Sequence, residues 1–452
     1  MPRAVTNHDL EVLMDEAGYG QAHAAFARQV NLAARAQGML RYDASSVYWW
    51  LRGRRPDSAI QIVIAAVLAR KIGRTLTVDD LGFGDDDVSL GLTYPTSRSA
   101  GIDTATQLWR LIVRRRDLLA TAPFATAAAL QTGFAWRYDP ADTDTGHVGL
   151  RRVTTSDVAT LRLFADQFAD LDRRHGGGSD HTRALLATFL HHQVTPMLHG
   201  SYTDTVGRDL MGAAAALVGQ LAFMSYDAGE HGAAQRHFTI GLRLAKAADD
   251  RLYGAHLLAN LATQATYLGH GTEAVRLARA ALDGAGRAPA TVLARLYTAE
   301  ACAHAVAGDR RACTTALGKA AKAIDRSKHG EGPPWVGYFS PAHYAGTALR
   351  CFRDLRLYRQ ALQRADEALN LHTDNVRTRA LHTALLATTH ADAGDLDAAC
   401  LTGTRAVDLA DGVESRRVRQ RFTELHDRLL PHRRVPKADD LLERLRAMPT
   451  AA

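Results

Sequence analysis

The sequence contains few cysteines, few aromatic residues and no long apolar run, and each shortage excludes a class of protein. No stretch approaches about 18 apolar residues and the N-terminus lacks a signal-peptide core, so we expect a cytoplasmic protein without a membrane span. The cysteines number 4 among 452 residues and form no CxxC pair, so we expect small buried thiols and no disulfide framework. They are Cys302, Cys313, Cys351 and Cys400.

Signatures of catalysis and of bound metal are also missing. The chain contains no HExxH, no GxSxG, no Walker loop and no dinucleotide-binding fingerprint. His191, His192 and His199 lie close in sequence, but no carboxylate stands at ligand spacing from them. The glycines of "HGGGSDH", from His175 to His181, lack the Lys and Ser/Thr of a phosphate-binding loop and form a turn. We therefore expect no enzyme, no metal site and no cofactor.

The composition predicts an all-α protein with more than one domain. Hydrophobic residues make up 46% and charged residues 23%, as in folded soluble proteins, and few stretches alternate with β-branched residues. A chain of 452 residues is too long for one core and predicts about two to four domains or an extended array. The predicted parts are an N-terminal domain at 1–83, a linker at 84–101, connecting helices at 102–206, a repeat domain at 207–430 and a tail at 431–452.

Glycines recur in the second half of the chain at regular intervals. Gly229, Gly269 and Gly308 are 40 and 39 residues apart, and Gly394 stands in a similar segment. A fifth copy begins at Leu355 and lacks the glycine, which leaves Arg356 at the corresponding position. Small residues follow each position at two distances, as closely packed helix pairs require: Ala234, Ala274, Cys313, Ala361 and Ala399, then Gly241, Ala281, Ala320 and Ala406.

These positions resemble the tetratricopeptide repeat in the turn glycine and in the small residues. The large aromatic residue of the first helix is mostly missing, and the period exceeds the usual one of about 34 residues. The resemblance implies helical hairpins stacked into an α-solenoid, whose concave wall is lined by the first helix of each hairpin.

Counting back from the glycines places one set of residues on this wall. Arginines with an amide and aromatic rings suit an extended peptide or an acidic group; a solvated groove without a ligand, or one that binds another subunit, is the alternative. The predicted wall residues are Tyr226, Asn260, Tyr267, Arg295, His343, Arg350 and Arg353, with Asp227, His256 and Thr298 nearby.

The N-terminal domain contains two adjacent tryptophans in "DASSVYWWLRGRRP", from Asp43 to Pro56. Neighbours on a helix are about 100° apart, so one ring faces the core while the other does not. With Asp43 as N-cap, one face of the predicted helix carries Ala44, Val47, Trp50 and Leu51, and the other carries Ser45, Tyr48, Trp49 and Arg52. Trp50 is therefore expected in the core and Trp49 on an exposed face, where it contacts DNA or covers a neighbouring helix.

This segment follows a helix containing "FARQV" and precedes an apolar helix, an order that resembles the XRE-type (lambda-repressor-like) helix-turn-helix family. The resemblance implies that Phe26, Ala27 and Val30 are buried and that the helix from Ser45 to Arg52 enters the major groove. The usual glutamine of the second helix aligns with His23, and the connection from Val30 to Asp43 is longer than in the compact motif. The candidate DNA-binding residues are Gln21, His23, Ser45, Ser46, Tyr48, Trp49, Arg52, Arg54 and Arg55.

The distribution of charged residues supports DNA binding more than the net charge of the chain does. The formal net charge is only +7, but basic residues prevail between Arg52 and Arg74, where Asp57 is the single acid; a second basic run spans Arg416 to Arg421.

Both resemblances together are typical of actinobacterial regulators. They imply a transcription factor that binds double-stranded operator DNA as a homodimer and senses a peptide, a small molecule or a protein partner. The alternative is a repeat scaffold whose N-terminal domain mediates protein contacts instead of binding DNA.

Overall fold

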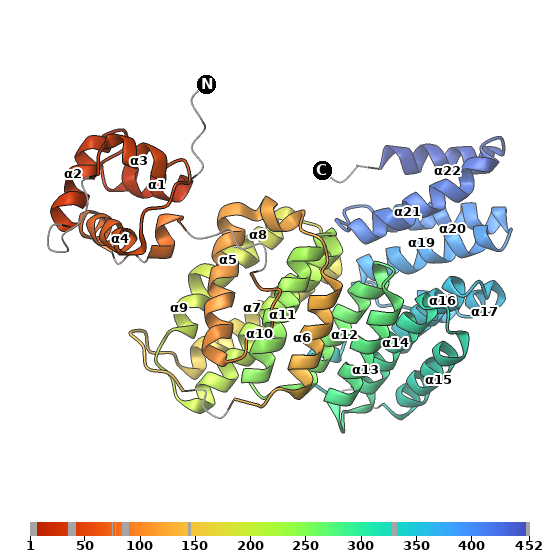
Figure 1. Ribbon diagram of the computed structural model, residues 1–452. Coiled ribbons are helices and arrows are strands. Elements are labelled where there is room, and N and C mark those ends of the chain that lie inside the picture. Colours follow the sequence, from red (N-terminus) through yellow and green to blue (C-terminus); the bar gives the residue numbers. More distant parts are fainter. Residues whose placement is uncertain are drawn as a thin grey trace. The chain divides into compact units, whose positions relative to one another are not determined.

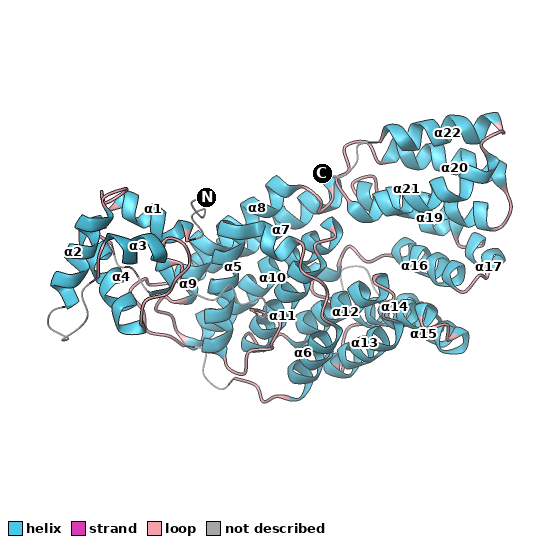
Figure 2. Ribbon diagram, turned by 45° about the horizontal axis from the view of Figure 1, so that its top comes forward, coloured by secondary structure: helices cyan, strands magenta, loops and turns pink. Residues whose placement is uncertain are grey.

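The computed structural model divides the chain into two compact units, Met1–Val88 and Ser89–Ala452, both built from helices (Figure 1). The structure describes residues 7–34, 42–74, 76, 78–83, 90–142, 146–327 and 332–448. Over these residues no β-strand forms, and the backbone pairs His147 with Tyr202 and Arg152 with Ser201 only as isolated bridges (Figure 2). The prediction of an all-α protein is confirmed.

The first unit packs short helices around an apolar core. Phe26, Val47 and Ile64 are fully buried there, and they come from three different helices. Asn7 ties the ends of the unit together, because its side chain caps the first helix and donates a hydrogen bond of 3.0 Å to the Leu81 carbonyl. Thr77, which the sequence suggests as a helix N-cap at the end of this unit, lies outside the described residues. The elements are α1 (His8–Glu16), α2 (His23–Ala34), α3 (Ala44–Trp50), α4 (Ser58–Ile72) and the 3-10 turn η2 (Val78–Leu81).

The second unit begins earlier than the sequence predicted. Tyr94 is buried in its core, and Arg236 donates a hydrogen bond of 2.9 Å to the Leu90 carbonyl. The predicted linker at 84–101 is therefore wrong from Leu90 onward, because an apolar side chain anchors this loop; residues 84–89 lie outside the described chain. The first helices are α5 (Arg98–Ala120), α6 (Thr126–Tyr138), α7 (Thr155–His175), α8 (Asp180–Phe189), the π-turn η3 (Leu190–Val194) and α9 (Thr195–Leu198).

Helical hairpins form the rest of the second unit. The five predicted turn positions all have a left-handed backbone, with φ of 82° at Gly229, 84° at Gly269, 77° at Gly308, 86° at Gly394 and 59° at Arg356. The nine predicted small residues are all buried. The helix pairs are α10 (Asp204–Ala228) with α11 (His231–Ala247), α12 (Arg251–Tyr267) with α13 (Gly271–Ala285), α14 (Ala290–Val306) with α15 (Arg310–Arg326), α16 (Pro341–Asp354) with the short α17 (Tyr358–Leu362) and α18 (Ala365–Leu369), and α19 (Val376–Asp392) with α20 (Leu396–Leu409).

A sixth pair, α21 (Arg416–Leu429) and α22 (Pro436–Ala447), ends the array. Ala438, Leu441 and Leu442 of α22 are buried against the preceding helices. The predicted tail at 431–452 is therefore wrong as far as Ala447, because the apolar residues of this segment are spaced for one helix face.

Candidate functional site

Helix α3 of the first unit begins at a capping box. The Asp43 carboxylate accepts hydrogen bonds from the Ser46 amide at 2.8 Å and the Ser46 hydroxyl at 2.9 Å. Hydrogen bonds from Ser46 lower the pKa of Asp43 below its usual value. The predicted N-cap is confirmed. The hydroxyl of Ser46, predicted to contact DNA, instead holds the start of the helix.

The two faces of α3 differ as the sequence predicted, with one exception. Val47, Trp50 and Leu51 are buried, and Trp50 packs against Tyr42 with ring centroids 5.2 Å apart. Ala44 is exposed, contrary to the prediction, because the first turn of α3 precedes the point where the helix meets the core. Trp49 is 37% exposed and Trp50 only 3%. The side-by-side tryptophans therefore have opposite environments.

The outer face of α3 forms a short row of rings and a cation. The Arg52 guanidinium lies 3.5 Å from the centroid of the Tyr48 ring and donates a hydrogen bond to the Tyr48 carbonyl at 3.2 Å. The Trp49 ring meets the Tyr48 ring edge-on at a centroid distance of 5.5 Å. Ser45 is exposed beside them. Stacking fixes the direction of Arg52, so this face presents a flat, positively charged surface.

The remaining candidate DNA-binding residues lie on either side of this face in the chain. Arg54 and Arg55 are exposed directly after α3. Gln21 is exposed before α2, and His23 is half-exposed at its first position. Helix α2 packs against α3 and turns Phe26, Ala27 and Val30 into the core, as predicted.

Asn31 has a structural role that the sequence analysis missed. Its side chain donates a hydrogen bond of 2.7 Å to the Tyr42 carbonyl and accepts one of 2.9 Å from the Tyr42 amide. These two hydrogen bonds join α2 to Tyr42, the residue before the N-cap of α3, and so set the direction in which α3 starts. An asparagine at a helix end is too common a residue to signal such a contact by itself.

In the second unit, α21 lies along the predicted inner wall. One arginine of its basic run faces inward, since the Arg417 guanidinium lies 4.6 Å from the centroid of the Tyr226 ring, and the Tyr267 hydroxyl donates a hydrogen bond to Gln420. Arg353 pairs with Asp392 at 3.2 Å and with Glu424 at 3.3 Å. Tyr226 and Arg353 are buried, so their prediction as open groove residues is wrong, because α21 covers them.

The turn before α16 covers another part of the wall. Trp335 stacks on His256 with centroids 4.7 Å apart, and the Tyr338 hydroxyl accepts a hydrogen bond of 3.0 Å from Arg295. Arg295 also donates to the Asn260 side chain at 2.7 Å. Asn260 is thus buried and already bonded, contrary to the prediction of an open groove residue. The missed signal was the spacing, since 48 residues separate Gly308 from Arg356 while earlier intervals are 40 and 39.

His343 and Arg350 are half-buried on α16, and Tyr267 is half-buried at the end of α12. The His343 ring meets Tyr338 edge-on at 5.4 Å, and burial lowers the pKa of His343 to about 3. The structure therefore brings the predicted wall residues into one region, but it fills most of the space between them with the chain's own side chains.

A buried ionic cluster joins helices near the start of the second unit to helices near its end. We call these contacts the seam. The Arg377 guanidinium binds Asp172 at 2.7 Å, and the Arg417 guanidinium binds Asp227 at 2.6 Å. The Gly178 amide donates a hydrogen bond of 2.7 Å to the Glu414 carbonyl. The seam joins α7 and α10 to α19 and α21.

The seam explains the three consecutive glycines of "HGGGSDH". A Cβ atom on Gly178 would lie 2.5 Å from the Glu414 carbonyl oxygen, closer than atoms can approach. Burial opposes ionisation of Asp227, but Arg417 and Arg377 outweigh it and hold the pKa of this carboxyl below its usual value. The glycines serve close packing of two backbone segments.

Of the three histidines that lie close in sequence, His191 is half-buried while His192 and His199 are exposed. The His191 and His192 rings touch at a centroid distance of 4.6 Å, and His199 lies 3.3 Å from the Thr106 hydroxyl. In the described part of the chain, no group of three or more His, Cys, Asp or Glu is arranged to hold a metal ion. All four cysteines are buried, as predicted.

No helix among the described residues has the length and apolar character to cross a membrane.

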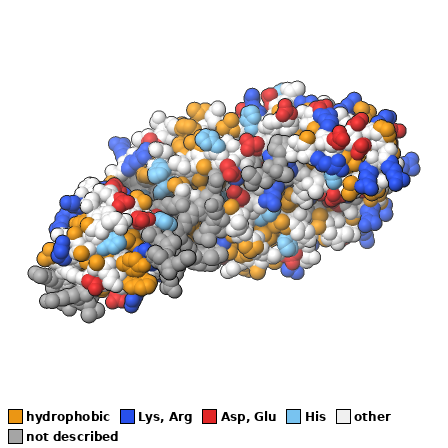
Figure 3. Space-filling view, turned by 90° about the horizontal axis from the view of Figure 1, so that it is seen from above, with side chains coloured by type: hydrophobic (Ala, Val, Ile, Leu, Met, Phe, Trp, Pro, Cys, Tyr) orange, Lys and Arg blue, Asp and Glu red, His pale blue; other side chains and the backbone are white. Residues whose placement is uncertain are grey.

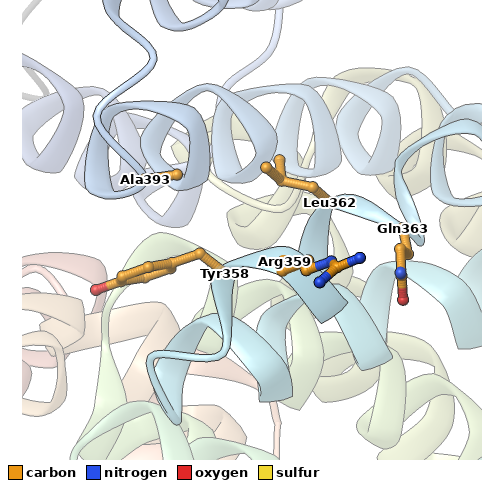
Figure 4. A pocket seen from close by; sticks show the side chains of 5 residues that line it. All are labelled: Tyr358, Arg359, Leu362, Gln363 and Ala393. Atoms are coloured by element: carbon orange, nitrogen blue, oxygen red, sulfur yellow. The ribbon is translucent and has the colours of Figure 1, made fainter.

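A surface hollow of about 580 Å³ lies beside α17 (Figure 4). Its lining is mixed and shares no residue with the predicted wall: Tyr358, Arg359, Leu362, Gln363 and Ala393. Acidic and basic side chains intermingle on the face of the second unit shown in Figure 3. Arg444 of α22 and Asp408 of α20 form an exposed ion pair. Neither feature collects groups of one chemical kind, so neither competes with α3 as a functional surface.

A family model matches the first unit of the protein. A family model described as the SP15 N-terminal domain matches residues 10–84, the region of α1 to η2. No curated protein matches the chain. The match supports the first unit as a separate module and names no activity.

Proposed function

We propose that the protein is a DNA-binding transcriptional regulator of the helix-turn-helix type, with a tetratricopeptide-like solenoid that senses an effector. The observation that carries this proposal is the outer face of α3, where Trp49, Tyr48 and Arg52 form one flat, basic surface. An arginine held in place by stacking is suited to bind a guanine edge or a phosphate, and the rings are suited to contact a thymine methyl or a sugar.

The surroundings of α3 support the same function. Arg54 and Arg55 are exposed where the chain leaves the helix, a position from which they can contact phosphates on either side of a groove. The acids Asp9, Glu11, Asp15 and Glu16 gather instead on α1. A scaffold domain that contacts only proteins has no need for this separation of charge.

We propose further that the second unit makes the protein a homodimer. Two copies bind neighbouring half-sites in most helix-turn-helix systems, because one small domain gives limited specificity. Helices α7 and α8 carry exposed apolar side chains: Leu163 is 60% exposed and Leu185 52%, next to the touching rings of Phe164 and Phe189. A patch of this kind is typical of an interface.

The test of DNA binding is fluorescence anisotropy with genomic fragments, including the promoter of the protein's own gene, at matched salt. We expect Arg52→Ala to weaken binding by about 1–3 kcal/mol without unfolding the unit. Arg74→Ala is the matched control, since Arg74 is in the same unit but pairs with Glu16 at 3.0 Å on the surface. Equal affinity of Arg52→Ala and the unchanged protein would place the DNA contact elsewhere than on the outer face of α3, and absence of DNA binding by the unchanged protein would favour the scaffold alternative.

A further inference from the structure

Arginines gather where α16 meets α21, inside the second unit. The Arg421 guanidinium pairs with Glu424 at 2.7 Å, and Arg353 binds the same carboxylate at 3.3 Å. Arg353 also lies 3.9 Å from Asp354, whose other oxygen is 3.6 Å from Arg350. These contacts place three guanidinium groups around two carboxylates.

The charges of this cluster do not balance. Asp392, the next carboxylate along the cluster, is shared by Arg353 and Arg428, so four guanidinium groups face three carboxylates. Arg350 lies farthest from its nearest carboxylate, at 3.6 Å, and within the described chain its buried Nε has no hydrogen-bond partner. Burial and the charge of Arg350 lower the pKa of Arg421. An excess positive charge with little solvent around it is costly without a counter-charge.

Solvent reaches the cluster from one side. The side chains of Arg350 and Arg421 are 20% and 14% exposed, and Gln420 is exposed beside them. The half-buried Tyr267 hydroxyl lies next to Gln420, and burial raises the pKa of Tyr267 to about 12, so it stays a neutral donor. The accessible groups are thus two cations and the Gln420 amide, beside the Tyr267 ring, whose hydroxyl already donates to Gln420; together they suit an anion attached to a flat or apolar group.

We propose that Arg350 and Arg421 bind the anionic group, a carboxylate or a phosphate, of a small molecule. Two guanidinium groups bind such oxygens with charge-assisted hydrogen bonds. A long extended peptide fits this wall less well, because α21 and the turn carrying Trp335 and Tyr338 already cover its two flanks.

The bound anion would connect α16 with α21, the helix that completes the seam. Ligand binding therefore favours the closed array over any form in which α21 is displaced, through its differential affinity for the two. The effect on operator DNA rests on the proposed function, whereas binding of the anion does not.

The experiment is calorimetric titration of the full chain with inorganic phosphate, citrate and benzoate, each against sodium chloride at equal ionic strength. We expect saturable binding of at least one of the three and a rise in melting temperature with it. A preference for phosphate over the two carboxylates, or the reverse, identifies the source of the anionic group. Absence of any saturable binding beyond chloride overturns the proposal.

Variants separate the cluster from general charge. Arg350→Gln should weaken binding of the preferred anion at least about tenfold, as loss of a charge-assisted contact does. Arg434→Gln removes the same charge from an exposed position outside the cluster and should leave binding unchanged. Equal affinities of the two variants contradict the site. If circular dichroism shows that Arg350→Gln is unfolded, Arg421→Lys decides, since it keeps the charge but loses the planar fork.

DNA binding by the unchanged protein is then measured with and without the preferred anion. An altered DNA affinity supports regulation through the array. Anion binding without DNA binding in either state leaves the site intact and contradicts only the proposed function.

Discussion

The two units of this protein solve the problem of burial in different ways. The first encloses large apolar side chains such as Phe26, Ile64 and Leu68, and Asn7 is its one buried polar residue in the described chain. The second is rich in buried alanine, which lets helices approach closely, and it buries several arginines and histidines. A small domain with a single core needs large apolar side chains to fill it. Stacked hairpins need small residues between their helices, and they can enclose polar groups if these are paired.

Low pH should produce the largest difference in stability between the two units. Burial lowers the pKa of His237 and of His256 to about 3, so these residues stay neutral in the folded second unit while the unfolded chain takes up protons below about pH 6.5. Stability is then complete above about pH 6.5 and falls as the pH drops toward the folded-state values, by about 1–2 kcal/mol per buried histidine at pH 5. His343 and His231, whose pKa burial lowers to about 3 and about 4, add to this loss.

Urea unfolding of the full chain at pH 7.5 and pH 5 measures this loss. His237→Gln should reduce the pH dependence, and the surface variant His8→Gln should leave it unchanged. A first unit that lost stability in parallel with the second would contradict the difference between them.

Removing one charge of the seam is the next largest change. Arg377→Ala leaves the buried Asp172 without its closest partner and should cost about 3–5 kcal/mol of unfolding free energy in the second unit. Arg444→Ala breaks the exposed pair with Asp408 and should cost at most about 1 kcal/mol. Similar costs for both, by denaturant melts, would show that the seam adds nothing to stability.

In the first unit, the adjacent tryptophans offer a matched pair of equal size. Trp50→Ala should cost about 3–5 kcal/mol, as loss of a large core side chain does. Trp49→Ala should cost less than about 1 kcal/mol, because its ring lies on the outer face of α3 and is 37% exposed. Thermal melts of the two variants test this, and equal shifts would contradict the assignment of faces on α3.

The smallest effect concerns glycine in the second unit. Gly178→Ala forces a Cβ against the Glu414 backbone and should cost about 1–3 kcal/mol. Gly318→Ala, in the middle of α15 with open space around the new Cβ, should instead stabilise by about 0.5–1 kcal/mol. Opposite signs in melting temperature are the expected result; a stabilising Gly178→Ala would mean that the seam opens freely.

The features that sequence alone could predict are local ones. The opposite environments of Trp49 and Trp50 follow from the 3.6-residue period of one helix. The turn at Arg356 was predicted although its glycine is missing, and the structure gives it the same left-handed backbone as the glycines. Both conclusions need only residues within one or two helices.

The features that the sequence did not reveal depend on distant partners. Nothing near Arg417 indicates that it meets Asp227, 190 residues earlier. That contact arises from the curvature of the whole array. The curvature is the sum of many small rotations between hairpins, so it cannot be predicted from the sequence of any one hairpin. The same curvature brings α21 over Tyr226 and Tyr267, so residues on a predicted open wall became interior ones.

The seam also bears on how the chain is made. Asp172 binds Arg377 across 205 residues and Asp227 binds Arg417 across 190, so neither contact exists until nearly all of the second unit has left the ribosome. Earlier helices pack through local contacts as they emerge, but the acidic side chains on α7 and α10 must wait for their arginines. A chain that stops short of Arg377 leaves both carboxylates without these partners. These two contacts therefore distinguish a full second unit from one that is truncated before Arg377.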